Sequence, residues 1–327
     1  MRAFLALVCI AVAASAQAQT RIEQAKREGD LVWYTSMNVA DVEAVLKPFR
    51  ERYPFLYLSI LRAPGSGVRS SILSEARDGR YRWDVVSANL GDVHRLARAG
   101  LLAPYASPQT ASGFPPGTVD PEGHWAAIYL RHYVIAYNRA LVKPEEAPKS
   151  WQALLDPHWA GKLGLDEDDA EWYAGMLEYW GHDRTVAYMR ALARQRPQFR
   201  GSHQVLTDQL AAGELALALV YANEIDSARR AGAPVEWLHS FDPIIASPSP
   251  IAISVRAPHP AAARLLVDYL LSPEGQRVIR SRFRAPARSD VGGAPPAALK
   301  LHALKPRVAV DYFDEREAEF RRLLAPR

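Results

Sequence analysis

The sequence predicts an α/β protein of two lobes, each a mostly parallel sheet flanked by helices, joined by two crossing strands. Three observations lead to this fold class. Short apolar segments alternate with segments of helical periodicity over residues 31–99, and the alternation returns over residues 163–231. Two longer apolar stretches, residues 125–137 and 244–255, separate these blocks and have the length of strands that run from one lobe to the other. The 327 residues suffice for two domains of ordinary size.

Residues 1–18 have the pattern of a cleavable signal peptide. Arg2 provides a short positive region, and residues 3–14 form an apolar segment that is too short to span a bilayer. Ala-Ser-Ala and Ala-Gln-Ala follow, which places cleavage after Ala16 or Ala18. We therefore expect a protein exported to the periplasm.

Composition excludes several classes of function. The only cysteine, Cys9, lies in the signal peptide, so the mature chain is expected to have neither disulfides nor thiolate sites. The net charge of +4 is scattered, and no run of Lys or Arg with interleaved aromatic residues occurs, so nucleic acid is not an expected partner. No later apolar run has the length of a membrane span. We expect a monomer.

The first lobe is expected over residues 19–135. Its strands and helices alternate as 31–34, 42–53, 55–61, 68–78, 83–86 and 90–99. In open sheets of this kind, ligands bind beyond the carboxyl ends of the strands. The polar loops at those ends supply five candidate ligand-binding residues: Tyr34, Ser36, Asn38, Ser66 and Asn89.

The second lobe is expected over residues 136–250, and residues 251–327 are expected to return to the first lobe and end in helices. A short strand at 163–165 leads into an acidic turn, and a strand at 215–221 leads into another polar loop. The candidate ligand-binding residues of this lobe are Asp166, Asp169, Tyr173, Tyr221, Asn223 and Glu224.

The acidic turn Asp166-Glu167-Asp168-Asp169 has two interpretations. Carboxylates at a strand-to-helix turn disfavour anions and favour a metal ion or an amine as ligand. Asp is also a good N-cap, and acids in a first helical turn complement the helix dipole. We expect at least one of the four to face the ligand.

Several segments in order resemble the solute-binding proteins of ATP-driven (ABC) importers, in particular the group that includes ferric-ion-binding proteins. The most specific are SWQALLDPHWAGKLGL and LLSPEGQRVI; LVWYTSMN, WDVVSAN, HYVIAYNRALV and AAGELALALVYANEIDSARR also match. The resemblance implies a periplasmic-binding-protein fold, a ligand held in a cleft between lobes, and an ABC permease as partner.

The resemblance carries over less well at the metal site. The ferric-binding members hold iron with a His, a Glu and paired tyrosines, and their positions correspond by spacing to Asn38, Asn89, Asn223 and Glu224. Neutral amides are poor ligands for iron(III), which prefers anionic oxygen. If a metal is bound, Glu224 and the phenolates of Tyr173 and Tyr221 are the expected ligands.

We therefore expect an exported receptor whose ligand is a metal ion or a cationic or zwitterionic small molecule. A sensor module is one alternative, and an anion such as phosphate or phosphonate is another, since Arg62, Arg69 and Arg131 remain available. We expect neither an enzyme nor a resident cofactor. The nine histidines are dispersed without His-x-x-x-His or His-Glu-x-x-His spacing, and no Gly-x-Ser-x-Gly elbow occurs.

Overall fold

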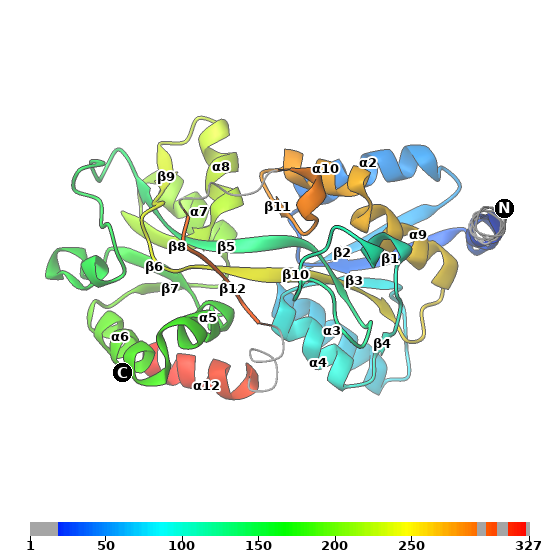
Figure 1. Ribbon diagram of the computed structural model, residues 1–327, viewed down its shortest axis with the longest axis horizontal. Coiled ribbons are helices and arrows are strands. Elements are labelled where there is room, and N and C mark those ends of the chain that lie inside the picture. The colour runs from blue at the N-terminus through cyan, green and yellow to red at the C-terminus, as the bar shows by residue number, and fades with distance from the viewer. Residues whose placement is uncertain (1–18, 293–298, 306–312, 325–327) are drawn as a thin grey trace, which may run out of the picture. The chain divides into compact units, whose positions relative to one another are not determined.

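The computed structural model describes residues 19–292, 299–305 and 313–324 (Figure 1). The expected signal peptide, residues 1–18, lies outside them. The chain forms two compact units. Unit 1 combines the described residues up to Phe114 with Val119–Ile128 and Pro250–Val278. Unit 2 combines Pro115–Thr118 and Tyr129–Ser249 with the described residues from Ile279 onward.

Unit 1 is built on a parallel sheet in the order β2-β1-β3, with the second half of β10 antiparallel to β3. Its strands are β1 (Asp30–Thr35), β2 (Tyr57–Arg62), β3 (Val85–Ser87) and β4 (Leu102–Ala103), with β10 at Ile244–Ser254. Its helices are the helical residues 19–28, α2 (Val39–Arg52), α3 (Gly65–Arg77), α4 (Leu90–Arg98), η1 (Pro108–Ala111), α9 (Pro260–Leu271) and most of α10 (Pro273–Ser281).

Local sequence accounts for the strand-to-helix alternation of unit 1. Trp33 of β1 and Val85 of β3 are fully buried, because apolar residues fill the short strands that pack between the helices. The carboxyl ends of the three parallel strands lie at one edge of the sheet, where α2, α3 and α4 begin. This edge is where polar side chains are placed for recognition in open α/β sheets.

Unit 2 has a sheet in the order β5-β8-β6-β7, in which β6 is parallel to β7 and β8, and β5 is antiparallel to β8. The strands are β5 (Ala126–Asn138), β6 (Leu163–Asp166), β7 (Gln198–Arg200), β8 (Leu217–Tyr221), β9 (Val235–Trp237), β11 (Ala285–Pro286) and β12 (Leu301–Ala303). The helices are α5 (Ala170–Trp180), α6 (His182–Arg194), α7 (His203–Ala212), α8 (Ala222–Arg230) and α12 (Phe313–Leu324), with short turns η2 (Gln152–Leu155), η3 (Pro157–Trp159) and η4 (Ser289–Val291).

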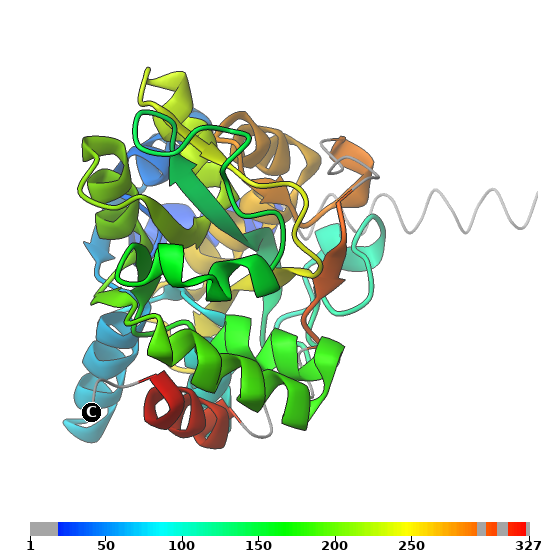
Figure 2. The same cartoon turned by 90° about the vertical axis from the view of Figure 1, so that its left-hand side faces the viewer.

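The C-terminal segment completes the core of unit 2. Figure 2 shows α12, in red, beside α5 and α6. Phe320 of α12 is buried, and its ring centroid lies 6.4 Å from that of Trp172. The expected return of residues 251–327 to the first lobe therefore differs from the structure: only Pro250–Val278 belong to unit 1. The reason is hydrophobic, because Phe320 and Leu324 fill the core of unit 2.

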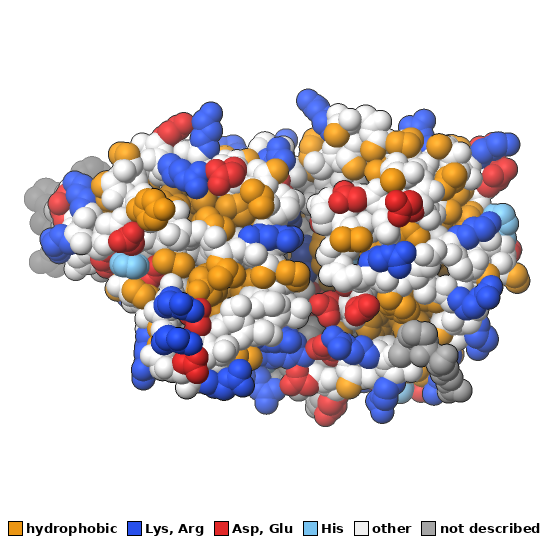
Figure 3. Space-filling view, turned by 180° about the vertical axis from the view of Figure 1, so that it is seen from behind, with side chains coloured by type: hydrophobic (Ala, Val, Ile, Leu, Met, Phe, Trp, Pro, Cys, Tyr) orange, Lys and Arg blue, Asp and Glu red, His pale blue; other side chains and the backbone are white. Residues whose placement is uncertain are grey.

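Strands β5 and β10 each contain residues of both units, as the crossing strands of the predicted fold should. Within the described residues, no helix is both long and apolar enough to cross a membrane. Acidic and basic side chains are interspersed over the face drawn in Figure 3. This mixture agrees with the scattered charge in the sequence.

Candidate functional site

Five polar side chains meet at the carboxyl edge of the unit 2 sheet. Asp166 ends β6, Tyr221 ends β8, and Asp169 immediately precedes α5. His203, the first residue of α7, lies with its Nε2 2.9 Å from Asp169 Oδ1 and 3.7 Å from Asp166 Oδ2. Its ring centroid is 3.9 Å from that of Tyr221. We call these four residues and Glu224 the His203 cluster; the field of Glu224 acts on His203 as well.

The acidic turn folds back on its own backbone. Asp166 Oδ1 accepts a hydrogen bond from the N–H of Asp168 at 3.0 Å, and Asp169 Oδ2 accepts one from the N–H of Asp166 at 3.2 Å. Asp168 also pairs with Arg321 of α12 at 3.2 Å. The turn is thus stabilised by hydrogen bonds to its own backbone, although Asp169 makes no side-chain capping hydrogen bond to α5 in the described chain. Its carboxylates also surround a histidine that was not among the candidates from the sequence.

Electrostatics inside the cluster shift two pKa values. Burial alone lowers the pKa of His203, but the adjacent carboxylates of Asp169 and Asp166 raise it to about 9. Burial raises the pKa of Asp166 to about 6, although the positive imidazole opposes the shift. Near neutral pH the cluster therefore contains a charged histidine among carboxylates.

The cluster has more negative than positive charge. Three carboxylates, those of Asp166, Asp169 and Glu224, act on the single imidazolium of His203. Thr207 donates a hydrogen bond to Glu224 at 3.2 Å, which orients that carboxylate. Carboxylates in this arrangement attract a ligand group of positive charge.

One buried polar atom at this edge, the Nδ1 of His203, has no partner in the described chain. Asn223, in the first turn of α8, is only 7% exposed. Because leaving a buried donor or acceptor unpaired costs free energy, an atom such as His203 Nδ1 marks a place where a ligand or water completes the bonding.

A buried ion pair between Arg131 and Glu171 contacts the His203 cluster through Tyr221. Arg131 of β5 donates to Glu171 of α5 at 2.6 Å and to the Tyr221 hydroxyl at 3.1 Å. It also donates to the carbonyl of Pro248 in β10 at 3.2 Å. Burial raises the pKa of Tyr221, so its hydroxyl stays protonated near neutral pH. Arg131 is thereby committed to the protein, which removes one of the three arginines considered for an anion.

Tyr173 does not join the His203 cluster. It lies on the side of α5 that faces α12, with its ring centroid 5.8 Å from that of Phe320. Burial and the neighbouring Glu319 raise its pKa. The structure therefore places Tyr173 in the packing between two helices, although its position in the sequence, just after the acidic turn, suggested a ligand contact.

The candidates of unit 1 have mixed surroundings. The hydroxyl of Tyr34 donates to Glu75 at 2.8 Å, and burial raises the pKa of Tyr34 to about 12. Asn38 caps α2, accepting from the N–H of Asp41 at 2.8 Å. Ser36 donates its backbone N–H to Ser87 at 3.0 Å, which joins the loops after β1 and β3. Tyr34 and Asn38 thus have structural partners.

The starts of α3 and α4 lie side by side at the carboxyl edge of unit 1. The N-cap residue of neither helix makes a side-chain capping hydrogen bond in the described chain; Ser66 and Asn89 lie at these starts. A Cβ on Gly65 would lie 2.5 Å from Asp92 Oδ2, so glycine permits the close approach of the two helices. Asp92 also pairs with Arg69, which commits a second candidate arginine. Backbone N–H groups at helix starts suit an oxyanion.

Among the residues that the structure describes, no group of three or more His, Cys, Asp or Glu side chains could hold a metal ion. The Tyr133 ring packs 5.1 Å from that of Tyr221, centroid to centroid, and burial raises the pKa of Tyr133 well above its ordinary value. Phenolate ligands for iron(III) would have to form against this burial.

His203 was missed because histidines were assessed by their spacing to one another. A usable signal was present: Gly201-Ser202-His203 follows β7 and opens a helix, the position at which the acidic turn follows β6. Ser202 caps α7, accepting from the N–H of Val205 at 3.3 Å. A histidine in the next strand-to-helix turn of the same lobe is a natural partner for those acids.

Two curated relatives are similar over part of the chain. The Fe(3+)-binding periplasmic protein of Serratia marcescens is 23% identical over 53% of this chain, and the match spans about half of the relative, 54%. A Salmonella typhimurium protein named as a candidate 2-aminoethylphosphonate-binding periplasmic protein is 28% identical over 69% of this chain and 68% of its own length.

Among solved structures, the periplasmic binding protein AfuA from Actinobacillus pleuropneumoniae, determined with fructose-6-phosphate, superposes with a TM-score of 0.82. The identity is 22%, and the match covers 90% of this chain and 98% of AfuA. This likeness confirms the predicted fold.

The family model for bacterial extracellular solute-binding proteins matches residues 86–315, which is most of the chain. That family consists of ligand-binding receptors, so the prediction of a solute-binding receptor that serves an ABC importer is confirmed, while the solute stays open. By its motifs, its fold and this match, the chain belongs to the bacterial extracellular solute-binding proteins.

Proposed function

We propose that this receptor binds a small organic zwitterion carrying a primary amine and an oxyanion such as a phosphonate. The observation that carries the proposal is the charge of the His203 cluster: three carboxylates surround one imidazolium, next to the buried amide of Asn223. An ammonium group offers positive charge and hydrogen-bond donors to these carboxylates. The relative named for 2-aminoethylphosphonate supports this class of solute.

Within unit 1, the starts of α3 and α4 suit an oxyanion. The N-cap residues of α3 and α4 make no side-chain capping hydrogen bond in the described chain, and backbone N–H groups at helix starts bind phosphonate or phosphate oxygens. Ser66 and Asn89 lie at these starts and are expected to contribute.

The second candidate ligand is iron(III), which the Serratia relative supports by its name. Tyr133 and Tyr221 lie close together and are the residues that would supply phenolates. Their buried, protonated state and the neighbouring Arg131 favour the zwitterion instead.

Ligand-dependent melting of the full chain tests the proposal. We expect 2-aminoethylphosphonate to raise Tm in a concentration-dependent way, and ethanolamine or ethylphosphonate, which each have only one of the two groups, to do so far less. Replacement of Glu224 by Gln should weaken the binding of 2-aminoethylphosphonate with little change in the Tm of the free protein. Stabilisation by ferric ion alone, or by ethylphosphonate as strongly as by 2-aminoethylphosphonate, would contradict the proposal.

The remaining parts of the assignment concern the cell. We propose that a cleavable signal at residues 1–18 directs export, and that the protein as a monomer delivers the solute to an ABC permease. We also propose that the protein binds the solute without changing it chemically and without a resident cofactor. The family's role as receptors supports this. Recovery of intact 2-aminoethylphosphonate after incubation with the protein, and N-terminal sequencing of the exported form, check these points.

A further inference from the structure

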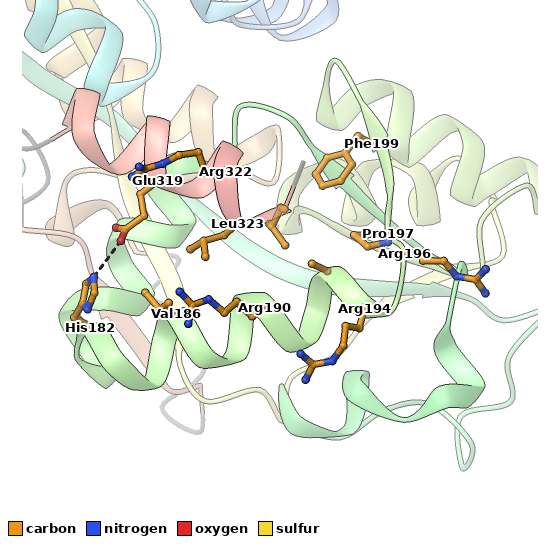
Figure 4. A pocket seen from close by; sticks show the side chains of 12 residues that line it. His182, Val186, Arg190, Arg194, Arg196, Pro197, Phe199, Glu319, Arg322 and Leu323 are labelled. Atoms are coloured by element: carbon orange, nitrogen blue, oxygen red, sulfur yellow. Dashed lines mark hydrogen bonds and ion pairs between the residues drawn. The ribbon is translucent and has the colours of Figure 1, made fainter. Parts of the chain in front are cut away.

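A hollow lies in unit 2 between α6 and α12, away from the His203 cluster. Its volume is about 1000 Å³. Four arginines line it: Arg190, Arg194, Arg196 and Arg322. Figure 4 shows Arg190 and Arg194 on α6 and Arg322 on α12, with Leu323 between the helices. We call this hollow the α6–α12 groove.

The groove combines an apolar floor with basic walls. Val186, Ala193, Phe199 and Leu324 supply apolar lining. None of the four arginine side chains forms an ion pair or hydrogen bond with another residue of the described chain. Glu319, the acidic residue of the lining, is already paired with His182 and with Arg316, each at 3.0 Å. The groove therefore presents positive charge that the described chain leaves unbalanced.

Two features of these arginines oppose local preference, although Arg194 in the last turn of α6 complements the helix dipole. Arg190 and Arg194 stand four residues apart on α6, a spacing at which like charges repel. Arg196, just after the end of α6, has a φ of 52°, in the left-handed region that favours glycine or asparagine after a helix. A charge arrangement that opposes helix stability is expected where an external partner neutralises it.

We propose that the α6–α12 groove binds an acidic amphipathic helix of a partner protein. Complementarity of charge and shape supports this occupant. The 13 residues of α6 make one wall about 20 Å long. A helix with leucines on one face and glutamates beside them matches the apolar floor and the arginines. A flat bilayer surface would contact the rims of a hollow and leave the floor unfilled. The proposal is independent of which solute the receptor carries.

The test measures fluorescence anisotropy of a labelled synthetic peptide with Glu and Leu at helical spacing, titrated with the full-length protein. We expect saturable binding that weakens as salt is added. The variant R190E/R194E/R322E should bind about tenfold more weakly or worse. The control variant R77E/R98E/R230E reverses three arginines that are also exposed but lie outside the groove, and it should bind like the unmodified protein.

Three results would overturn the proposal. Equal binding of a second peptide, with Lys in place of Glu, would remove the role of charge. Equal losses in both triple variants would show a nonspecific field. Binding to phosphatidylglycerol vesicles without binding to the Glu/Leu peptide would assign the groove to a membrane surface. Circular dichroism of each variant establishes that it is folded.

Discussion

His203 determines the surroundings of the acidic turn, residues 166–169, through a contact that the sequence alone did not show. The acidic turn was recognisable from the sequence, and so were its two interpretations. Which interpretation applies depends on a histidine that reaches the turn from α7, and its Nε2 is 2.9 Å from Asp169. That contact is set by the parallel pairing of β6 with β7. Contacts of this kind join distant parts of the chain, so local patterns in the sequence do not reveal them.

The shifted pKa of His203 predicts a pH dependence of stability. The native state binds this proton more tightly than the unfolded chain. The stability that it contributes is therefore fully present below pH 6.5 and is lost as the pH rises through about 9. The pKa of Asp166 is raised from 3.8 to about 6, so its contribution to stability also falls as the pH rises between those two values. Urea unfolding between pH 3.8 and pH 9 should therefore show a free energy of unfolding that falls with pH.

Replacement of His203 by Gln should flatten that fall between pH 6.5 and 9, because the titrating group is gone. The matched control replaces His158, which is exposed on η3, by Gln and should leave the slope unchanged. An unaltered slope in the His203 variant would show that its proton is not linked to folding.

At the scale of elements, hydrophobic periodicity was a sufficient guide to long segments. The expected helix at 42–53 overlaps α2, and the expected strand at 215–221 contains β8. The three-residue strands β7, β9 and β12 were not foreseen, because so few residues cannot display a period.

The packing of α5 against β10 predicts a sensitive glycine. A Cβ added to Gly175 would lie 2.5 Å from Cγ2 of Ile245. Gly175→Ala should therefore lower the free energy of unfolding by about 1–3 kcal/mol through overpacking. Chemical denaturation measures the change, and a double-mutant cycle with Ile245→Ala, which removes Cγ2, should show that the two losses are less than additive.

Gly201→Ala is the matched control for that experiment. Gly201 also belongs to unit 2, but nothing lies within 4 Å of the place that a Cβ would occupy there, and its φ is not in the left-handed region. Its replacement should be neutral or slightly stabilising, since alanine restricts the unfolded chain. A Gly175 variant as stable as this control would mean that α5 can shift away from β10 at no cost.

For the molecule as a whole, the two-lobe fold followed from the sequence, but the membership of the last segment did not. The segment that contains LLSPEGQRVI was expected to return to the first lobe, and α9 and most of α10 do belong to unit 1. The sequence predicted helices at the end of the segment that returns to the first lobe, whereas α12 belongs to unit 2. That choice depends on Phe320 meeting Trp172 and Tyr173, a match of surfaces that no local pattern encodes.

Removing that contact should destabilise unit 2 more than unit 1. Phe320→Ala is expected to cost about 3–5 kcal/mol, because a large buried ring leaves a cavity. Hydrogen exchange should then accelerate in β6, β8 and α5 of unit 2, while β1 and β3 of unit 1 keep their protection. Equal acceleration in both units would show that they unfold as one cooperative body.

The assignment of residues after Ile279 to unit 2 also sets an order of events as the chain emerges from the ribosome or a translocation pore. All three segments of unit 1 have emerged once Val278 is out, whereas unit 2 still lacks Phe320 and Leu324. Unit 1 can therefore reach its native core first, and the apolar faces of α5 and α6 stay uncovered until α12 arrives. During that interval unit 2 is the part of the nascent protein that needs a chaperone.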